Sequence, residues 1–498
     1  MILSGNKCTV EEKAKILRDA GFNENGSGNT AGNIPPPKNV SDYLLNDIGA
    51  GDLFVDTYGD IVRYVADTSS FAVYTGDKWK MNAHAEVTEY SKILTSQIMP
   101  VMASGISDDN KRILWFKYCG KMQSNNAKAE MLRSASTKRE INIDLADFDR
   151  GYRFFNVQNG VLDLEAMNFF KHDKTRLLSM IANVEYNPGV KFPRWERFIQ
   201  QIMCYDEDRA RFLKKSKGYS LLGNPVEDCL FIDLGVTTRN GKSTLERTML
   251  NIFGDYGKTA MPETLAVNRF KSGNSSSPEL ARLRGVRYLN MPEPSKGLEL
   301  DGAVTKQLTG RDPVLTRNLY QGFFEYIPQY VIWINSNYRP VVNDMTLFQS
   351  GRIFCIPFEA QFPEERQEKD LIEQFSQPEA KSAILNWLLD GLTLYREEGL
   401  RRDVPISVSS CTKDYADDSN TFGAFLRECI MNCENYFTLT KDVYRSYENW
   451  AKDGGYRPMS MKSLVSEMKR RGYRDKRKNS GSGFMDIILL TDFPHGWM

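Results

Sequence analysis

Histidine is scarce in this sequence, and its cysteines are too scattered to suggest a metal site. Three histidines, His84, His172 and His495, occur among the 498 residues, which also include eight cysteines. The closest cysteine pair, Cys429 and Cys433, has the i, i+4 spacing of one helix face and no second pair nearby. These patterns argue against zinc or iron binding. We therefore expect reduced thiols, and metal chemistry that uses carboxylates and a nucleotide, which suits Mg²⁺.

Long apolar runs are also missing. No segment reaches the roughly 18 consecutive apolar residues of a membrane-spanning helix. The first five residues lack the basic and apolar regions of a signal peptide. Hydrophobic residues make up 41% and charged residues 26% of the chain, values typical of a globular protein, and its length predicts roughly two to four domains. We expect an intracellular protein without a membrane partner.

The net charge is only +1, but basic residues gather near the carboxyl terminus. Between Lys441 and Lys478, twelve Lys and Arg residues face five Asp and Glu residues. Apolar helix faces at 443–451 and 464–468, followed by a basic Gly/Ser hairpin at 476–483, predict a winged helix that binds duplex DNA. A solvated charge run and a localisation signal are the alternatives. The phosphate contacts are assigned to Lys462, Lys469, Arg470, Lys476, Arg477 and Lys478.

The segment 229–254 predicts a buried strand, a polar loop and a helix. The apolar run ends at Gly235, and an apolar-periodic helix begins at Gly241-Lys242-Ser243 and ends at Gly254. Backbone N–H groups and a lysine at such a loop bind phosphate, so a nucleoside triphosphate is the expected ligand. The nucleotide-binding residues are predicted to be Gly235, Arg239, Asn240, Gly241, Lys242, Ser243 and Thr244.

The spacing of this loop departs from the usual pattern. Five residues instead of four separate its two glycines, and Val236 occupies the position expected for another glycine. An ordinary strand-turn-helix connection is therefore the alternative to a phosphate loop.

Polar residues lie directly before or after several apolar segments that follow in the sequence. A strand at 286–292 is followed by Glu293, a Gly-Arg-Asp turn lies within 306–317, a strand at 331–334 runs into 335–337, and Arg352 precedes an apolar run at 353–358. The order of these features is more specific than any one of them.

The amino-terminal part is simpler. We expect an amphipathic helix at 9–20 and a linker at 22–40. A hairpin is predicted at 71–79, helices over 85–150, two strands around the Asn-Gly turn within 154–164, and a helix-rich stretch from Pro193.

From about Asp52 to Leu490 the sequence resembles the helicase part of phage and plasmid primase-helicases, which combine a poxvirus-type helicase-associated domain with a superfamily 3 motor. The matching segments are 156–164, 240–244, 278–283, Glu293, 306–312, 335–337, and Arg352 with 356–358. The resemblance implies an α/β fold with an AAA+ P-loop core. Its expected units are an amino-terminal helix and linker at 1–40, an α+β helicase-associated domain at 41–200, the ATPase at 201–400 and the winged helix at 401–498.

The resemblance also implies roles for individual residues. Lys242 and Ser243 would hold the phosphates and Mg²⁺, and Glu293 would be the Walker B acid that polarises the attacking water and helps to hold the metal. Asn337 would orient that water, and Arg352 would reach the ATP of a neighbouring subunit. A hairpin that contacts DNA in the ring channel would use Lys306, Arg311 and Arg317.

Together these features predict an ATP-dependent replicative DNA helicase that moves on single-stranded DNA as a homo-hexameric ring in the host cytoplasm, with ATP and Mg²⁺ as cofactors. No catalytic primase motif precedes residue 50, so priming is expected on another polypeptide or outside this sequence. One alternative is an origin-binding initiator in which ATP only drives assembly. Another is a small-molecule kinase, which would need a substrate lid and no basic tail.

Overall fold

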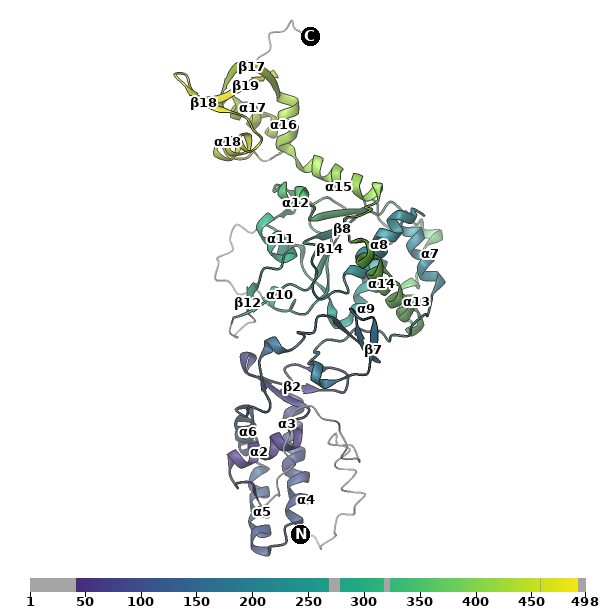
Figure 1. Cartoon of the computed structure of the whole chain (residues 1–498), viewed down its shortest axis with the longest axis vertical. Coiled ribbons are helices and arrows are strands. Elements are labelled where there is room, and N and C mark those ends of the chain that lie inside the picture. Colours follow the sequence, from purple (N-terminus) through teal and green to yellow (C-terminus); the bar gives the residue numbers. More distant parts are fainter. Residues whose placement is uncertain (1–41, 268–277, 318–322, 457, 491–498) are drawn as a thin grey trace.

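The computed structural model describes residues 42–267, 278–317, 323–456 and 458–490. The described chain is elongated, with a helical amino-terminal unit, a central sheet covered by helices, and a small carboxyl-terminal unit following one another along the long axis (Figure 1). The predicted helix at 9–20 and linker at 22–40 lie outside the described residues. Within the described parts, no helix is long and apolar enough to cross a membrane.

The amino-terminal unit packs helices beside a four-stranded sheet of order β3-β2-β1-β4. Tyr74 pairs with Trp79, which confirms the predicted hairpin. The helices expected over 85–150 are also present. The unit's elements are α2 (Asp47–Tyr58), β1 (Val62–Val65), β2 (Ser70–Tyr74), β3 (Trp79–Lys80), α3 (His84–Ile93), the π-helix η3 (Leu94–Ile98), α4 (Met99–Ser104), α5 (Asp109–Met122), α6 (Asn125–Ser136) and β4 (Asn142–Ile143).

A three-stranded antiparallel sheet follows, formed by β5 (Phe154–Val157), β6 (Gly160–Asp163) and β7 (Asn168–Phe170). The predicted turn is present, since Val157 pairs with Gly160. Phe155 stacks on Tyr256 with ring centroids 4.8 Å apart, and both belong to the core cluster of the central unit. Residues 154–184, placed by sequence in the amino-terminal domain, therefore share the core of the central sheet.

The central sheet is parallel throughout, with the order β16-β8-β14-β10-β9. Both faces are covered, so its strands are buried and nearly continuously apolar. Phe231 belongs to the cluster formed with α8 (Glu207–Tyr219) and α14 (Pro378–Glu398). Its neighbour Ile232 belongs to the cluster formed with α11 (Gly302–Thr309) and α15 (Ile406–Ser419), because successive side chains point to opposite faces. The strands are β8 (Leu230–Leu234), β9 (Gly257–Thr259), β10 (Tyr288–Pro292), β14 (Val331–Ser336) and β16 (Ile353–Pro357).

Glycines set the closeness of the helices on the first face. A Cβ at Gly218 would lie 2.4 Å from the Leu392 backbone N, and one at Gly391 would lie 2.1 Å from the Lys214 backbone O, so α8 and α14 approach through these two residues. As predicted, α7 begins at Pro193. The helices of this face are α7 (Pro193–Ile202), α8 (Glu207–Tyr219), α9 (Lys242–Phe253), α13 (Leu371–Ser376) and α14 (Pro378–Glu398).

The opposite face carries α15 and several shorter elements. The predicted Gly-Arg-Asp turn lies between α11 and β12, and β12 pairs with β13 in a hairpin. Residues 318–322, between these two strands in sequence, lie outside the described residues. The elements are α10 (Pro278–Ala281), β11 (Glu299–Leu300), α11 (Gly302–Thr309), β12 (Val314–Thr316), β13 (Phe324–Tyr326), β15 (Val341–Val342), α12 (Thr346–Gln349) and α15 (Ile406–Ser419).

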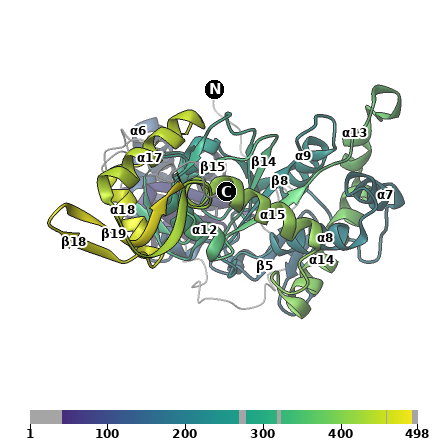
Figure 2. The same cartoon turned by 90° about the horizontal axis from the view of Figure 1, so that it is seen from above.

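The carboxyl-terminal unit combines three helices with an antiparallel sheet of order β17-β19-β18. The predicted helices and basic hairpin are present, and Figure 2 shows the β18–β19 hairpin projecting away from the rest of the molecule. Strand β17 was not predicted, because a bulge between Asn432 and Phe437 breaks its alternation. The elements are α16 (Thr421–Cys429), β17 (Ile430–Leu439), α17 (Thr440–Asp453), α18 (Met461–Arg470), β18 (Asp475–Lys478) and β19 (Gly481–Leu489).

Candidate active site

The segment 235–241 connects β8 to α9 at the carboxyl end of the parallel sheet. Gly241 has φ of +88°, and a Cβ there would lie 2.3 Å from Cγ2 of Ile202 in α7. It caps α9 without a side chain, so no side chain at this residue competes for the N–H groups of the first turn. Asn240 is 4% exposed and donates from Nδ2 to the Thr237 carbonyl at 2.6 Å, which holds the loop from within.

The ammonium group of Lys242 is the centre of this site. Its Nζ donates to the Gly235 carbonyl at 3.1 Å, to the Ser336 carbonyl at 2.7 Å and to Oδ1 of Asn337 at 2.8 Å. These acceptors come from the ends of two adjacent strands, β8 and β14. The lysine therefore sits where the carboxyl ends of parallel strands meet, the usual place for ligands of open α/β sheets.

The electrostatics of Lys242 reflect its burial, since only 5% of the residue is exposed. Burial lowers the pKa of Lys242 to about 8, and the negative charges of Asp233 and Glu293 oppose that shift. The neighbouring Ser243 is exposed at the start of α9. A cation that is only partly compensated by carboxylates suits an incoming polyanion.

Glu293 and Asn337 lie at the same edge of the sheet. Glu293 directly follows β10, has φ of +46° and donates its backbone N–H to the Asn335 carbonyl at 2.7 Å. Its side chain is exposed, while Asn337 is half-buried. Because β10 and β14 are adjacent and in register, the two predicted residues follow neighbouring strands beside Lys242. Left-handed backbone at a non-glycine residue is frequent at functional sites.

A buried ionic cluster lies behind the loop. Lys217 of α8 contacts Oδ2 of Asp233 at 3.2 Å, Oε1 of Glu246 at 2.6 Å and the Tyr288 hydroxyl at 2.9 Å, and its Nζ is 3.2 Å from the ring centroid of Trp333. Lys217 is fully buried, and its two carboxylate partners are no more than 2% exposed. Tyr288 also donates to Glu246.

This cluster ties the strand before the loop to the helix after it, because Asp233 lies on β8 and Glu246 on α9. Burial raises the pKa of Asp233, and the charge of Lys217 opposes the shift. Among the described residues, Oδ1 of Asp233 is a buried acceptor without a hydrogen bond. Sequence reasoning missed these residues, although an aspartate within an apolar strand was a usable signal, since a buried charge needs a partner.

Arg352 lies at the other end of the sheet. It immediately precedes β16, and its carbonyl accepts a hydrogen bond from Leu230 at the start of β8. Its guanidinium donates to Oδ2 of Asp228 at 3.2 Å and to Oγ1 of Thr309 at 2.9 Å. A five-residue strand spans about 16 Å, so Arg352 and Lys242 occupy opposite ends of neighbouring strands.

The predicted DNA-binding residues fall into two places. Near the β12–β13 hairpin, Lys306 pairs with Asp344 at 2.7 Å, and the guanidinium carbon of Arg317 lies 4.7 Å from the ring centroid of Phe323, which is 56% exposed. Arg311 is exposed in the turn between α11 and β12.

In the carboxyl-terminal unit the basic residues differ in availability. Lys469 pairs with Asp475 at 2.6 Å and Arg470 with Glu467 at 2.7 Å, whereas Lys462 is exposed. Strand β18 lies on the projecting hairpin, and within the described part of the chain its three basic residues form no ion pair, although Lys478 Nζ lies 4.4 Å from the ring centroid of Phe437; the three residues are Lys476, Arg477 and Lys478.

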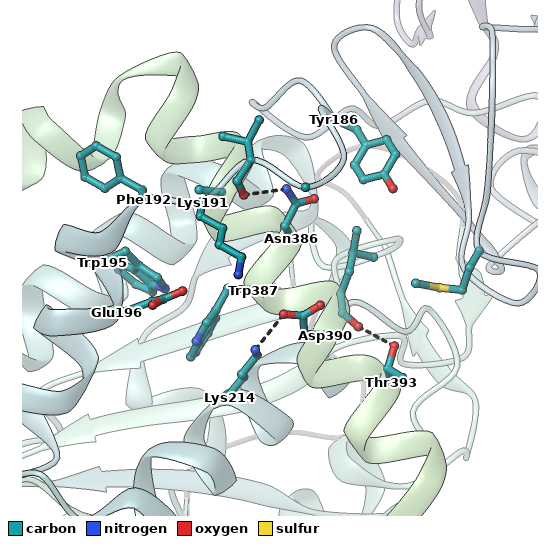
Figure 3. A pocket seen from close by; sticks show the side chains of 15 residues that line it. Tyr186, Lys191, Phe192, Trp195, Glu196, Lys214, Asn386, Trp387, Asp390 and Thr393 are labelled. Carbon is teal, nitrogen blue, oxygen red and sulfur yellow. Dashed lines mark hydrogen bonds and ion pairs between the residues drawn. The ribbon is translucent and has the colours of Figure 1, made fainter.

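A separate pocket of about 250 Å³ lies among α7, α8 and α14, away from the loop. Figure 3 shows Lys191, Trp387 and Asp390 around it, with Asp390 joined to Lys214 at 2.8 Å. None of the predicted site residues lines it. In the described ranges, no three His, Cys, Asp or Glu side chains gather in a way that could hold a metal ion.

Comparison with known proteins shows similarity over parts of the chain. Residues 51–204 match the family model described as D5 N terminal like. "Putative helicase L207/L206" of Acanthamoeba polyphaga mimivirus is 25% identical over 329 residues, covering 62% of this chain and 34% of that protein. "Putative helicase 121R" of Invertebrate iridescent virus 3 is 24% identical over 343 residues, covering 62% and 36%. The chain thus spans about a third of the length of these relatives.

Solved structures of the C-terminal region of NrS-1 are also similar. One apo structure covers 88% of this chain and 98% of its own, with 9% identity and a TM-score of 0.46. Another covers 89% and 100%, with 9% identity and a TM-score of 0.49.

Proposed function

We propose that this chain, a relative of the phage and viral primase-helicases, is an ATP-dependent DNA helicase that acts in replication of a phage, plasmid, virus or other mobile element. The observation that carries the proposal is the position of Lys242. Its ammonium donates to oxygens at the ends of β8 and β14, beside the amino terminus of α9, whose N-cap is Gly241. The parallel sheet around it supports a P-loop core of the AAA+ kind.

The residues at this edge fit MgATP. The first turn of α9, whose N-cap Gly241 has no side chain, and the Lys242 ammonium suit the phosphates, and the exposed hydroxyl of Ser243 with the carboxylate of Glu293 suits Mg²⁺. A bound Mg²⁺ would neutralise phosphate charge. Glu293 would accept a proton from the attacking water, and Asn337 would orient that water from the adjacent strand.

The location of Arg352 supports a ring. Within one chain it lies at the opposite strand ends from Lys242, so it serves catalysis only if it reaches the ATP of another subunit. In the isolated chain Asp228 and Thr309 hold its guanidinium, and 17% of the side chain remains exposed. We therefore propose a homo-hexamer in which Arg352 stabilises the charge that develops on the neighbour's phosphates.

DNA would be bound at two places, the β12–β13 hairpin and the carboxyl-terminal unit. The β12–β13 hairpin presents Arg317 and Phe323, a pairing suited to the backbone and bases of single-stranded DNA. The carboxyl-terminal unit, which we propose is a winged helix, would contact duplex phosphates mainly through the basic residues of β18, which are Lys476, Arg477 and Lys478. A separate primase or initiator remains a proposed partner, and the host cytoplasm the proposed location.

The proposal is tested by ATP turnover with and without single-stranded DNA, together with the particle mass in ATP. DNA should stimulate turnover, and the mass should be that of a hexamer. Lys242→Ala should abolish nucleotide binding, whereas Glu293→Gln should bind and not hydrolyse. Lys191→Ala and Glu397→Gln, exposed positions outside the site, are the matched controls. Wild-type hydrolysis by Glu293→Gln would place the water-activating acid elsewhere.

The irregular phosphate loop favours one alternative, an origin-binding initiator without processive unwinding. The loop has an extra residue, and Arg239 within it takes a left-handed φ of +60°. Slow turnover that single-stranded DNA does not stimulate, with ATP-dependent assembly on duplex DNA, would support the initiator.

A further inference from the structure

The helix α15 joins the central sheet to the carboxyl-terminal unit, as Figure 1 shows. It covers β16, which is an edge strand. Thr412 Oγ1 accepts the outward N–H of Cys355 at 2.9 Å, the Tyr415 hydroxyl donates to the Pro340 carbonyl at 2.5 Å, and Asp418 pairs with Arg339. Helix α16 begins at Thr421, two residues after α15 ends, so α15 is the attachment of the carboxyl-terminal unit.

Two cysteines meet at this attachment. Sγ of Cys355 in β16 lies 2.8 Å from Sγ of Cys411 in α15. This separation falls between the roughly 2.05 Å of a disulfide bond and the roughly 3.5 Å at which non-bonded heavy atoms pack best. Cys355 is fully buried, whereas Cys411 is half-buried and within reach of solvent. The two sulfurs can therefore join with little movement.

The electrostatics assign different roles to the two sulfurs. The hydrogen bond from Cys355, with the charge of Arg339, lowers the pKa of Cys411 against the effects of burial and Asp414. The same hydrogen bond and burial raise the pKa of Cys355. The thiolate therefore forms on the accessible partner, which is the reactive form of cysteine.

The other cysteines within the described residues lack this combination. Burial raises the pKa of Cys229, and Cys204 is exposed with no sulfur neighbour among the described residues. Cys429 and Cys433 are close in sequence, but Cys429 ends α16 while Cys433 lies on β17.

We propose that Cys355 and Cys411 are a reversible oxidation site for low-molecular-weight disulfides, and that the bond they form fastens α15 to β16. With oxidised glutathione, the Cys411 thiolate attacks one sulfur and expels one glutathione thiolate, leaving a mixed disulfide. Cys355 then loses its proton to the solvent, and its sulfur attacks that of Cys411 and expels the second glutathione. Two protein thiols are oxidised, and one glutathione disulfide is reduced to two thiols.

The site does not depend on the proposed helicase activity. Disulfides inside cells are usually transient and redox-sensing, which suits a partly exposed pair at a connection between structural units. Once formed, the bond prevents α15 from leaving the sheet edge, so the carboxyl-terminal unit keeps its attachment.

The test uses the full chain in buffers of graded reduced-to-oxidised glutathione ratio. Free thiols are alkylated, and proteolytic peptides are read by mass spectrometry. We expect the peptides of Cys355 and Cys411 to be joined and dithiothreitol to separate them. Cys355→Ser should stop at glutathionylated Cys411, and Cys411→Ser should leave Cys355 unmodified. Cys429→Ser is the control and should keep the link.

Hydrogen exchange provides a second measurement on the wild-type chain. Oxidation should slow exchange in peptides of α15 severalfold and leave α5 unchanged. Glutathionylation of Cys411 without a link to Cys355, or links that favour other cysteines, would overturn the proposal. Unchanged exchange in α15 after the link forms would refute the fastening role.

Discussion

Lys217→Met should loosen β8 and α9, the strand and helix on either side of the loop 235–241, while leaving the rest of the fold in place. The change removes a cation that contacts both Asp233 and Glu246 and keeps a side chain of similar length. Both carboxylates are buried, so they would lose this charged contact without gaining water. Breaking a buried ion pair in this way costs about 3–5 kcal/mol.

Local hydrogen exchange is the suitable assay, because a chain with several structural units need not unfold in one step. Since each 1.4 kcal/mol is tenfold, this cost predicts that peptides of β8 and α9 exchange roughly 10² to 4 × 10³ times faster than in the wild type. Peptides of α17 in the carboxyl-terminal unit should not change. The pH dependence follows from the raised pKa of Asp233. Protonation removes the buried charge of Asp233. The difference in exchange rate between Lys217→Met and the wild type, corrected for intrinsic exchange, should therefore be smaller at pH 6 than at pH 8.

Lys214→Met is the matched control on the same helix. Lys214 pairs with Asp390, whose side chain is 68% exposed, so its loss should cost less than about 1 kcal/mol. Adding Glu246→Gln to Lys217→Met removes one uncompensated charge and should recover much of the loss. If Lys217→Met exchanges within threefold of the wild type, or the double substitution recovers nothing, the ionic cluster does not hold the loop.

Further predictions concern the shared site, the loop and DNA. Arg352→Ala should assemble and bind ATP but not hydrolyse it. Mixing it with Lys242→Ala should restore some ATP hydrolysis. Mixed rings that stay inactive despite proven subunit exchange would mean that Arg352 serves only its ion pair with Asp228. Gly241→Ala should weaken ATP binding at least tenfold, because left-handed backbone costs about 1–2 kcal/mol and the new Cβ meets Ile202; Ile202→Ala should recover part of the affinity, and unchanged binding by the single variant would remove the loop from the site. Neutralising the basic residues of β18, which are Lys476, Arg477 and Lys478, should reduce the slope of log K for duplex binding against log salt concentration by up to about 0.9 per lost phosphate contact. Unwinding by rings already loaded on DNA should be affected less. An unchanged slope would mean that these residues are a solvated charge run.

The sequence alone determined the local elements of the candidate site. Apolar periodicity and glycine placement were enough to predict the strand before Gly235 and the helix after Gly241, and both are present. The same reasoning located the strands before Glu293 and Asn337 and the basic hairpin at 476–483. Parallel strands in one sheet bring their carboxyl ends together, so an ordered list of strand ends already outlined this edge.

The tertiary structure decided which distant residues meet. Lys217 finds Asp233 across 16 positions, Cys355 finds Cys411 across 56, and Arg352 finds Asp228 across 124. The bulged β17 was likewise invisible until it paired with β19. Periodicity reports only which face of an element is buried. Which helix covers that face, and which charge must be neutralised there, depends on the packing of whole elements, because a buried ion or thiol acquires its partner from whatever segment closes over it.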